Sequence, residues 1–381
     1  MFDKQYGGRR VFITGHTGFK GFWLTAWLLE LGAEIVGWSL DIPTNPSGFQ
    51  ALGLEKRITH LQGDMRDRDG LTAALNKFQP EVVFNLAAQA LVRKSYADPV
   101  QTFSTNAIGT MNMLEAVRAT PSVKALVLIT SDKCYRNDEW LFGYRETDHL
   151  GGKDPYSASK ACAEIIAQAY FHSFFGPGTK GPRAVTVRAG NVIGGGDWAE
   201  DRIVPDCARA FAKGKAVQIR NPEATRPWQH VLEPLSGYLR LGACLLREKS
   251  AGNDTGGLHM ESFNFGPPAE VKASVGDLAN ALEEYWPHFS MAARTTDVLE
   301  KKESTLLKLC CDKALALLDW KATLSFAETV RFTAQWYRSY YQSMENDKTT
   351  ADPTQYMYSL TLDQIRDYCQ LAKDRTLAWT R

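Results

Sequence analysis

The sequence has little of what marks secreted, membrane-spanning or metal-binding proteins. Its 381 residues contain no apolar run of about 18 residues, the length that a transmembrane helix requires. The first residues, MFDKQYGGRRVFITG, lack the apolar stretch of a signal peptide. The seven cysteines include no CxxC pair, and the seven histidines show no HExxH or Cys/His spacing. We therefore expect a reduced, cytoplasmic protein with no membrane segment and no metal site.

An excess of charge of either sign is also missing. The 44 Lys and Arg residues balance the 43 Asp and Glu residues, so the formal net charge is +1. Nothing in this balance favours nucleic acid or an acidic membrane surface as a partner. Hydrophobic residues make up 44% of the chain, which suits a globular protein with a sizeable core. At roughly 150 residues per domain, the length predicts two domains, or one domain with a lobe.

Short apolar segments alternate with helical patterns over the first half of the chain. Leu24, Trp27, Leu28 and Leu31 fall at the i, i+3, i+4, i+7 spacing of a helix. Strands separated by helices need crossover connections, and these place helices on both faces of a parallel sheet. We therefore predict an α/β protein with a doubly wound parallel sheet of the Rossmann type. The expected strands cover residues 10–14, 33–40, 58–64, 81–88, 124–130 and 183–189.

The alternation becomes irregular after residue 190. We expect a dinucleotide-binding domain over residues 1–189, with residues 229–265 returning to it. Residues 190–228 and 266–381 are expected to form a smaller mixed α/β substrate lobe and a C-terminal tail. A polar stretch, MENDKTTADPTQ, lies in that tail.

A glycine-rich turn follows the first expected strand. TGHTGFKG places Gly15, Gly18 and Gly21 between a strand and a helix. Such glycines allow a tight turn, close approach of the backbone to a pyrophosphate, and close packing of helix on strand. The start of the helix then faces the phosphates. His16 and Lys20 lie in the same turn, where either could be solvated.

Acidic residues after the next two strands extend this cofactor site. Asp41 ends the second expected strand, about 20 residues past the last glycine, where an acid can accept hydrogen bonds from the adenosine ribose. No Lys or Arg occurs in GWSLDIPTNPSG, so NAD is favoured over NADP. Asp64 is expected near the adenine, although a solvated loop acid is almost as plausible. The expected cofactor-binding residues are Gly15, Thr17, Gly18, Phe19, Gly21, Asp41, Asp64 and Ala87, together with Tyr156 and Lys160.

A tyrosine and a lysine stand four residues apart in PYSASK. On a helix this spacing places Tyr156 and Lys160 on one face. A phenol with a pKa near 10 is a poor base at neutral pH, and a nearby lysine cation is expected to lower that pKa. The pair can then take a proton from a sugar hydroxyl while a hydride leaves the same carbon. Three polar residues precede the pair in the sequence. Ser131, Asp132 and Lys133 directly follow the apolar segment LVLIT.

Taken together, these motifs resemble the extended short-chain dehydrogenase/reductase family. The resemblance rests on TGHTGFKG, NLAAQALV, TNAIGT, SDK, YSASK and RAGNVIGGGDW and covers roughly residues 8 to 340. Within that family the chain resembles the nucleotide-sugar 4,6-dehydratases, and its lysine after Ser-Asp is similar to those that act on CDP-glucose. The resemblance implies NAD as cofactor, CDP-glucose as substrate, and a homodimer or homotetramer. The implied reaction oxidises C4, eliminates water across C5 and C6, and returns the hydride to C6.

The resemblance also implies roles for the catalytic residues. Tyr156 would be the base at the C4 hydroxyl, Lys160 would tune it, and Ser131 would bond the C4 oxygen. Asp132 would protonate the departing C6 hydroxyl, and Lys133 would take the C5 proton. A lysine must be neutral to act as a base, so the titrations of Asp132 and Lys133 would be coupled.

The substrate residues implied by the resemblance are Asn191, Arg202 and Arg226 for the diphosphate and Gln89 near the nicotinamide or the sugar. Arginine binds diphosphate oxygens through two parallel hydrogen bonds, which suits this assignment. Trp228 and His230 could equally pack the lobe, and Arg93 could equally lie at the surface.

Three other functions remain open from the sequence. A nucleotide-sugar 4-epimerase needs Ser131, Tyr156 and Lys160 but not the Asp132–Lys133 pair. A dehydratase acting on a dTDP- or UDP-sugar is a near alternative, because the residues that read the base cannot be picked from the sequence. A non-enzymatic dinucleotide sensor on the same fold would not need the tyrosine–lysine pair.

Overall fold

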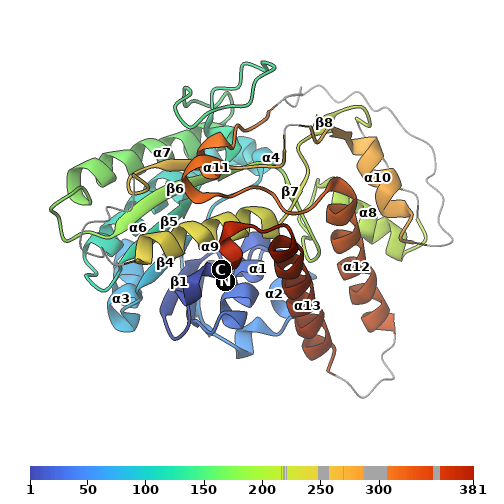
Figure 1. Ribbon diagram of the computed structural model, residues 1–381, viewed down its shortest axis with the longest axis horizontal. Helices are drawn as coiled ribbons and strands as arrows, with labels where there is room; N and C mark the ends of the chain where they lie inside the picture. The colour runs from blue at the N-terminus through green and yellow to red at the C-terminus, as the bar shows by residue number, and fades with distance from the viewer. Residues whose placement is uncertain are drawn as a thin grey trace.

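The computed structural model describes residues 1–215, 217, 219, 221–247, 257–268, 270–286, 307–345 and 352–381. Its centre is a parallel sheet of seven strands in the order β10-β6-β5-β4-β1-β2-β3 (Figure 1). The predicted doubly wound α/β fold is therefore confirmed. The strands are β1 (Arg10–Thr14), β2 (Glu34–Ser39), β3 (Thr59–Gln62), β4 (Val82–Asn85), β5 (Ala125–Ile129), β6 (Arg183–Ala189) and β10 (Ser262–Phe265).

Helices cover both faces of the sheet (Figure 1). Because side chains alternate along a strand, Val11 and Ile13 of β1 enter one core while Phe12 enters the other. The first core lies under α1 (Phe19–Glu30) and α9 (Leu232–Leu246). The second lies under α3 (Arg68–Phe78), α6 (Gly109–Arg118) and α7 (Pro155–Phe174).

The observed elements differ from the sequence prediction at several ends. β10, formed by SFNF, is a seventh strand that the sequence did not reveal, because four residues are too few for a clear periodicity. β2 ends at Ser39 and β3 at Gln62, both earlier than expected. The segment that holds TNAIGT begins as a π-helical segment, η3 (Ser104–Ile108), and continues as α6.

A smaller lobe lies beside the carboxyl ends of the strands (Figure 1). Its main helices are α8 (Ile203–Ala212), α10 (Val275–Glu283) and α12 (Phe326–Glu345). Two small sheets join it to the rest, one of β8 (Thr225–Arg226) with β11 (Ala273–Ser274), the other of β7 (Val192–Ile193) with β9 (Gln229–His230). The remaining short elements are α2 (Gly48–Ala51), α4 (Val92–Ala97), α5 (Pro99–Phe103), α11 (Asp312–Leu318), η1 (Phe2–Lys4), η2 (Leu54–Lys56), η4 (Asp132–Cys134) and η5 (Ala378–Thr380).

The end of the chain returns to its beginning. Helix α13 (Pro353–Asp374) packs against α1 and α2, and the two termini lie side by side (Figure 1). The rings of Phe2 and Trp379 stack with their centres 5.3 Å apart. The tail is thus tied to the sheet domain. Within the polar stretch expected there, residues 346–351 lie outside the described residues.

A buried glutamate on α9 joins three segments of this region. Glu233 accepts hydrogen bonds from the backbone N–H of Thr323 at 2.8 Å and of Leu324 at 2.6 Å. The Tyr368 hydroxyl of α13 donates to it as well, at 2.8 Å. Glu233 therefore holds α13 and the segment before α12 against the sheet domain.

The pH dependence of stability should report this contact. Burial raises the pKa of Glu233 to about 7, from an ordinary value of 4.5. Between pH 4.5 and about pH 7, Glu233 therefore keeps its proton in the folded protein and releases it in the unfolded chain. The resulting stabilisation, about 3 kcal/mol, is fully present below pH 4.5 and is lost as the pH rises through about 7.

We expect Glu233→Gln to flatten the fall in melting temperature over this window, because an amide keeps the shape and cannot titrate. Thermal unfolding from about pH 5 to about pH 8 would measure the difference. Glu55→Gln, at an exposed position on η2, is the control. An equal slope in wild type and Glu233→Gln would assign the pH dependence to other groups.

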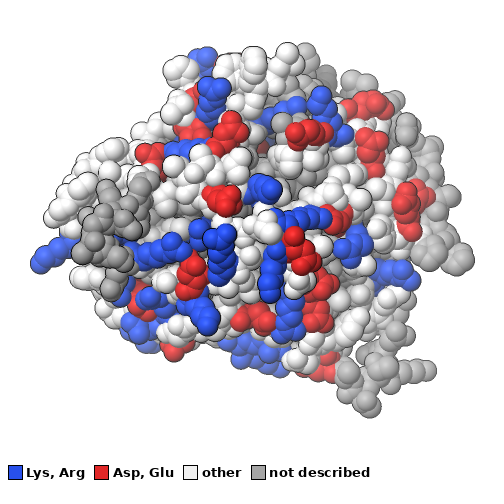
Figure 2. All heavy atoms as spheres, viewed as in Figure 1, with Lys and Arg blue, Asp and Glu red and all other residues white. Residues whose placement is uncertain are grey.

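The face of the molecule drawn in Figure 2 carries no large patch of side chains of one charge. Basic and acidic side chains are interspersed there (Figure 2), in agreement with the net charge of +1. Among the described residues, no helix is both long enough and apolar enough to cross a membrane.

Candidate active site

The glycine turn between β1 and α1 has the close approaches that its sequence predicts. Gly15 has a positive φ of 71°, and a Cβ there would lie 2.8 Å from the backbone nitrogen of Ala87. A Cβ on Gly21 would lie 2.0 Å from the Gly15 carbonyl oxygen. Gly18 caps α1, whose free backbone N–H groups begin at Phe19. This cradle and helix start suit the pyrophosphate of a dinucleotide.

Asp41 stands in the loop after β2 rather than at the end of the strand. Its side chain is exposed, and its carbonyl oxygen accepts a hydrogen bond from Thr17 Oγ1 at 2.7 Å. Asp64 is held by Arg66, whose Nη2 lies 2.5 Å from Asp64 Oδ2. The expected adenine contact therefore competes with an ion pair that the sequence did not suggest.

His16 is buried beneath the glycine turn and is not solvated. Its Nδ1 lies 2.8 Å from Ser39 Oγ, and its Nε2 lies 2.7 Å from Nδ1 of His60. Burial and the charge of His60 lower the pKa of His16 to about 3, so His16 is neutral. The hydrogen bonds of His16 with Ser39 and His60 thus join the glycine turn to β2 and β3.

The carboxyl end of β5 presents Ser131, Asp132 and Lys133 as the start of a short helix. Ser131 Oγ accepts a hydrogen bond from the Lys133 backbone N–H at 3.2 Å and donates to Asp132 Oδ1 at 3.0 Å. Asp132 is 7% exposed. Burial raises its pKa, against the lowering effects of Lys133, Ser131 and Lys20. The site thus favours a protonated carboxyl more than water does.

Tyr156 and Lys160 lie one turn apart near the start of α7, and both are buried. Burial lowers the pKa of Lys160 to about 8, although the charges of Cys134 and Glu164 raise it. Burial also raises the pKa of Tyr156 to about 12, against a hydrogen bond with Ser131 and the charge of Arg202, which lower it. The expectation that Lys160 lowers the pKa of the phenol was therefore wrong, because desolvation outweighs the hydrogen bond of Ser131 and the charge of Arg202.

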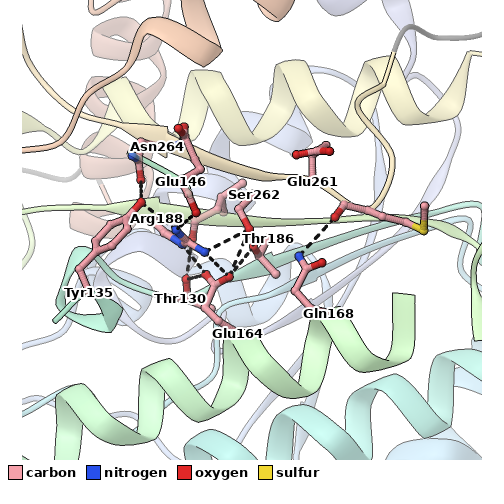
Figure 3. Close-up of polar contacts among 12 residues, drawn as sticks. Thr130, Tyr135, Glu146, Glu164, Gln168, Thr186, Arg188, Glu261, Ser262 and Asn264 are labelled. Carbon is pink, nitrogen blue, oxygen red and sulfur yellow. Dashed lines mark hydrogen bonds and ion pairs between the residues drawn. The ribbon is translucent and has the colours of Figure 1, made fainter. Parts of the chain in front are cut away.

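A buried ion pair fixes α7 on the sheet one turn after Lys160 (Figure 3). Arg188 Nη2 of β6 lies 2.8 Å from Glu164 Oε2, and Arg188 Nε lies 3.0 Å from Glu164 Oε1. Hydroxyl groups of the neighbouring strands donate to the same carboxylate, namely those of Thr130, Thr186 and Ser262. Removing either charge would leave the other buried without its partner. The network therefore sets the position of Tyr156 and Lys160 against the tip of β5.

The proposed diphosphate residues all follow β6 in the chain. Arg202 Nη1 lies 2.7 Å from Asp197 Oδ2, and its charge acts on the Tyr156 hydroxyl. Arg226 is half-buried in β8, where its Nη1 donates to the Thr225 carbonyl oxygen at 3.0 Å. Asn191 is half-buried between β6 and β7. Of these three, Arg202 is the one whose charge reaches Tyr156.

Gln89 has a structural function in the unliganded protein. Its amide accepts from the Leu91 N–H at 2.7 Å and donates to the Leu91 carbonyl at 3.0 Å and to Thr102 Oγ1 at 3.1 Å. Both of its N–H groups are thus used to hold the loop after β4.

Three further residues that the sequence left open pack or pair within the fold. Trp228 Nε1 donates to the Ala273 carbonyl at 3.1 Å. The His230 ring lies between those of Trp23 and Phe332, with centres 5.7 and 5.6 Å away. Arg93 forms a surface ion pair with Asp201 at 2.8 Å. Among the described residues, no group of three His, Cys, Asp or Glu side chains could hold a metal ion.

These groups can take up and release protons at a ligand bound over the strand ends. A buried carboxyl, a half-buried lysine and a tyrosine–lysine pair converge on the carboxyl ends of β5 and β6, where ligands bind in doubly wound folds. The sequence motifs named these four groups. They did not reveal the Glu164–Arg188 pair, although an arginine within the apolar strand RAVTVRA was a visible signal.

Sequence comparison places the chain among nucleotide-sugar enzymes. Residues 12–333 match the family model described as GDP-mannose 4,6 dehydratase. The chain is 45% identical over 344 residues to a CDP-glucose 4,6-dehydratase of Salmonella typhimurium, covering 89% of this chain and 94% of that protein. It is 25% identical to a dTDP-glucose 4,6-dehydratase of Xanthomonas campestris, covering 85% of this chain and 92% of that protein.

Solved structures share the fold at low identity. A dTDP-glucose 4,6-dehydratase of Streptomyces venezuelae with NAD and TYD bound has a TM-score of 0.70 and 21% identity, covering 86% of this chain and 97% of that chain. A UDP-glucuronic acid 4-epimerase of Bacillus cereus, in complex with UDP-glucuronic acid and NAD, has a TM-score of 0.71 and 22% identity, covering 86% and 99%. The fold alone therefore does not separate dehydration from epimerisation.

Proposed function

The chain belongs to the GDP-mannose 4,6-dehydratase family of the extended short-chain dehydrogenases/reductases, and on this premise we propose that it converts CDP-glucose to CDP-4-keto-6-deoxyglucose with NAD as cofactor. The observation that carries the proposal is buried Asp132 beside half-buried Lys133, next to Tyr156 and Lys160. The 45% identity to a CDP-glucose 4,6-dehydratase over 94% of that protein's length supports the choice of nucleotide. The enzyme would be a hydro-lyase.

The residues around the glycine turn fit a dinucleotide. The Gly15–Gly21 cradle and the start of α1 would hold the pyrophosphate, and exposed Asp41 would accept from the adenosine ribose. Bound NAD supplies the acceptor for the hydride of C4 and the donor for C6. Asp41 disfavours a 2′-phosphate, which supports NAD over NADP.

We assign the proton transfers to three side chains. Tyr156 takes the proton of the C4 hydroxyl, and Ser131 bonds the C4 oxygen. Ser131 and Arg202 both lower the pKa of Tyr156 and so favour the phenolate that must form, against burial. Lys160, one turn along α7, would bond the nicotinamide ribose.

The elimination uses the other two groups. The C4 ketone acidifies the C5 proton, which Lys133 removes. Asp132 protonates the departing C6 hydroxyl, a role that its burial favours because burial raises the pKa of Asp132. Lys133 then returns its proton to C5. An epimerase needs no such acid–base pair, so Asp132 and Lys133 favour dehydration.

A panel of nucleotide sugars tests the proposal. The protein, shown to bind NAD, would be incubated with CDP-, dTDP- and UDP-glucose separately, and the 4-keto-6-deoxy chromophore would be read in alkali. We expect a signal with CDP-glucose alone. A signal with dTDP- or UDP-glucose alone would support dehydration but contradict CDP-glucose as the substrate. Epimerised sugar without the chromophore would contradict dehydration and show that the protein is an epimerase.

We also infer a cytoplasmic homodimer or homotetramer. Exposed apolar side chains on η3 and α7 support pairing through these helices, since Ile108 is 45% and Ile165 is 59% exposed. A monomeric mass in light scattering would contradict this.

A further inference from the structure

The carboxyl ends of β5 and β6 lie side by side, and the pairing of the two strands sets which residues meet there. Ile129 of β5 pairs with Val187 of β6, and the Thr130 backbone N–H donates to the Val187 carbonyl at 2.9 Å. Continued by three residues, the same register brings residue 190 opposite Asp132. Residue 190 is a glycine, the first residue after β6. The sheet thus places a residue without a side chain beside the acid of the proposed elimination.

The Asp132 carboxyl group occupies the space where a side chain of residue 190 would begin. A Cβ on Gly190 would lie 3.1 Å from Asp132 Oδ2 and 3.7 Å from Asp132 Cγ, and the first of these distances is shorter than an ordinary contact. Pro227 Cγ would be 3.9 Å away, which is an ordinary contact. Gly190 has no positive φ, so its backbone conformation does not require glycine. The approach of Asp132 does.

The oxygen that faces Gly190 is the one available for the acid proton. Ser131 Oγ donates a hydrogen bond to Asp132 Oδ1 at 3.0 Å. A proton on this carboxyl is therefore expected on Oδ2. Asp132 is only 7% exposed, so its carboxyl is packed by protein and has little room to turn away from an added group.

The backbone is held on both sides of Gly190. Arg188, two residues earlier, forms the buried ion pair with Glu164. Val192, two residues later, begins β7, which pairs with β9. A side chain added at residue 190 should therefore displace the Asp132 carboxyl more readily than the strand.

We propose that Gly190 is a positioning residue for elimination, because its lack of a side chain leaves Asp132 Oδ2 in place to protonate the departing C6 hydroxyl. This inference rests on the proposed function. In the step, the C5–H bond breaks and its proton goes to Lys133, while a double bond forms between C5 and C6. The C6–O bond breaks, and the oxygen leaves as water with the proton of Asp132. The earlier oxidation at C4 does not use Asp132.

Gly190→Ala tests the inference, since it adds one methyl group beside Oδ2. In single turnovers with CDP-glucose we expect reduced cofactor to appear at the wild-type rate. A displacement of about 1 Å can cost about 100-fold in rate, and a methyl group requires only part of that movement, so elimination should slow by about 10-fold. Reduced cofactor should then accumulate. Gly7→Ala is the control, because its Cβ would lie 3.8 Å from the Leu31 carbonyl oxygen at an exposed position.

A CDP-glucose analogue with fluorine in place of the C6 hydroxyl separates this role from a purely structural one. Fluoride leaves without a proton from Asp132, and hydride return then gives the same 4-keto-6-deoxy product. Gly190→Ala should therefore convert the analogue at close to the wild-type rate. An equal deficit with both substrates would overturn the inference, and so would unimpaired loss of water from CDP-glucose.

Binding and the wild-type activity complete the test. Weaker binding of CDP-glucose by Gly190→Ala, with normal elimination at saturation, would also overturn the inference, because residue 190 would then act on its neighbour Asn191. A wild type that converts none of the three nucleotide sugars would overturn the proposed function, and this inference with it.

Discussion

Tyr156→Phe is expected to lose the first hydride transfer almost completely. The variant lacks the hydroxyl oxygen that takes the C4 proton in the proposed reaction, and on which Ser131 and Arg202 act. General base catalysis of this kind contributes about 100- to 10,000-fold, and we expect C4 oxidation to slow by that factor. The ring remains, so the packing at the start of α7 should persist and the melting temperature should hardly change.

The appearance of reduced cofactor in a single turnover would measure this loss. Tyr356→Phe is the matched control, because Tyr356 is 47% exposed on α13, away from β5. A wild-type rate of cofactor reduction in Tyr156→Phe would show that Tyr156 is not the base at the C4 hydroxyl.

Lys133→Ala is expected to divide the reaction in two. C4 oxidation uses Tyr156 and Lys160, so reduced cofactor should still form at a rate within a few-fold of the wild type. Elimination lacks its C5 base and should slow by roughly 100-fold or more. Reduced cofactor should therefore accumulate and persist.

Solvent isotope exchange sharpens this prediction. Wild-type product formed in deuterium oxide should carry deuterium at C5, since Lys133 returns an exchangeable proton there. Lys153→Ala removes an exposed lysine of the loop before α7, whose Nζ donates to the Asn137 carbonyl, and should behave as the wild type. Normal product formation by Lys133→Ala would show that another group removes the C5 proton.

The sequence contained enough to predict the fold and to name the four groups that we propose as catalytic. Apolar strands alternating with helices are local patterns, and the strand order follows from the general rules of doubly wound sheets. The tip of β5 and the spacing of Tyr156 and Lys160 are local as well. Each can be recognised because the residues that form it are adjacent or one helical turn apart.

Contacts between distant segments could not be predicted. Glu164 meets Arg188 across a helix and a strand, and Lys20 meets Tyr238 from the other end of the sheet domain. The direction of the pKa shift of Tyr156 was missed for a similar reason. It depends on how much of the surrounding protein excludes water, and that becomes known only when the lobe and the sheet are assembled.

The most direct test of the account follows the hydrogen of C4. CDP-glucose labelled with deuterium at C4 would be converted together with an equal amount of unlabelled substrate, and the product would be examined by NMR and mass spectrometry. The account predicts a 4-keto product whose deuterium lies in the C6 methyl group, on the molecules that began with the label. Deuterium retained at C4 of an epimerised sugar, or lost to solvent, would contradict dehydration by hydride return.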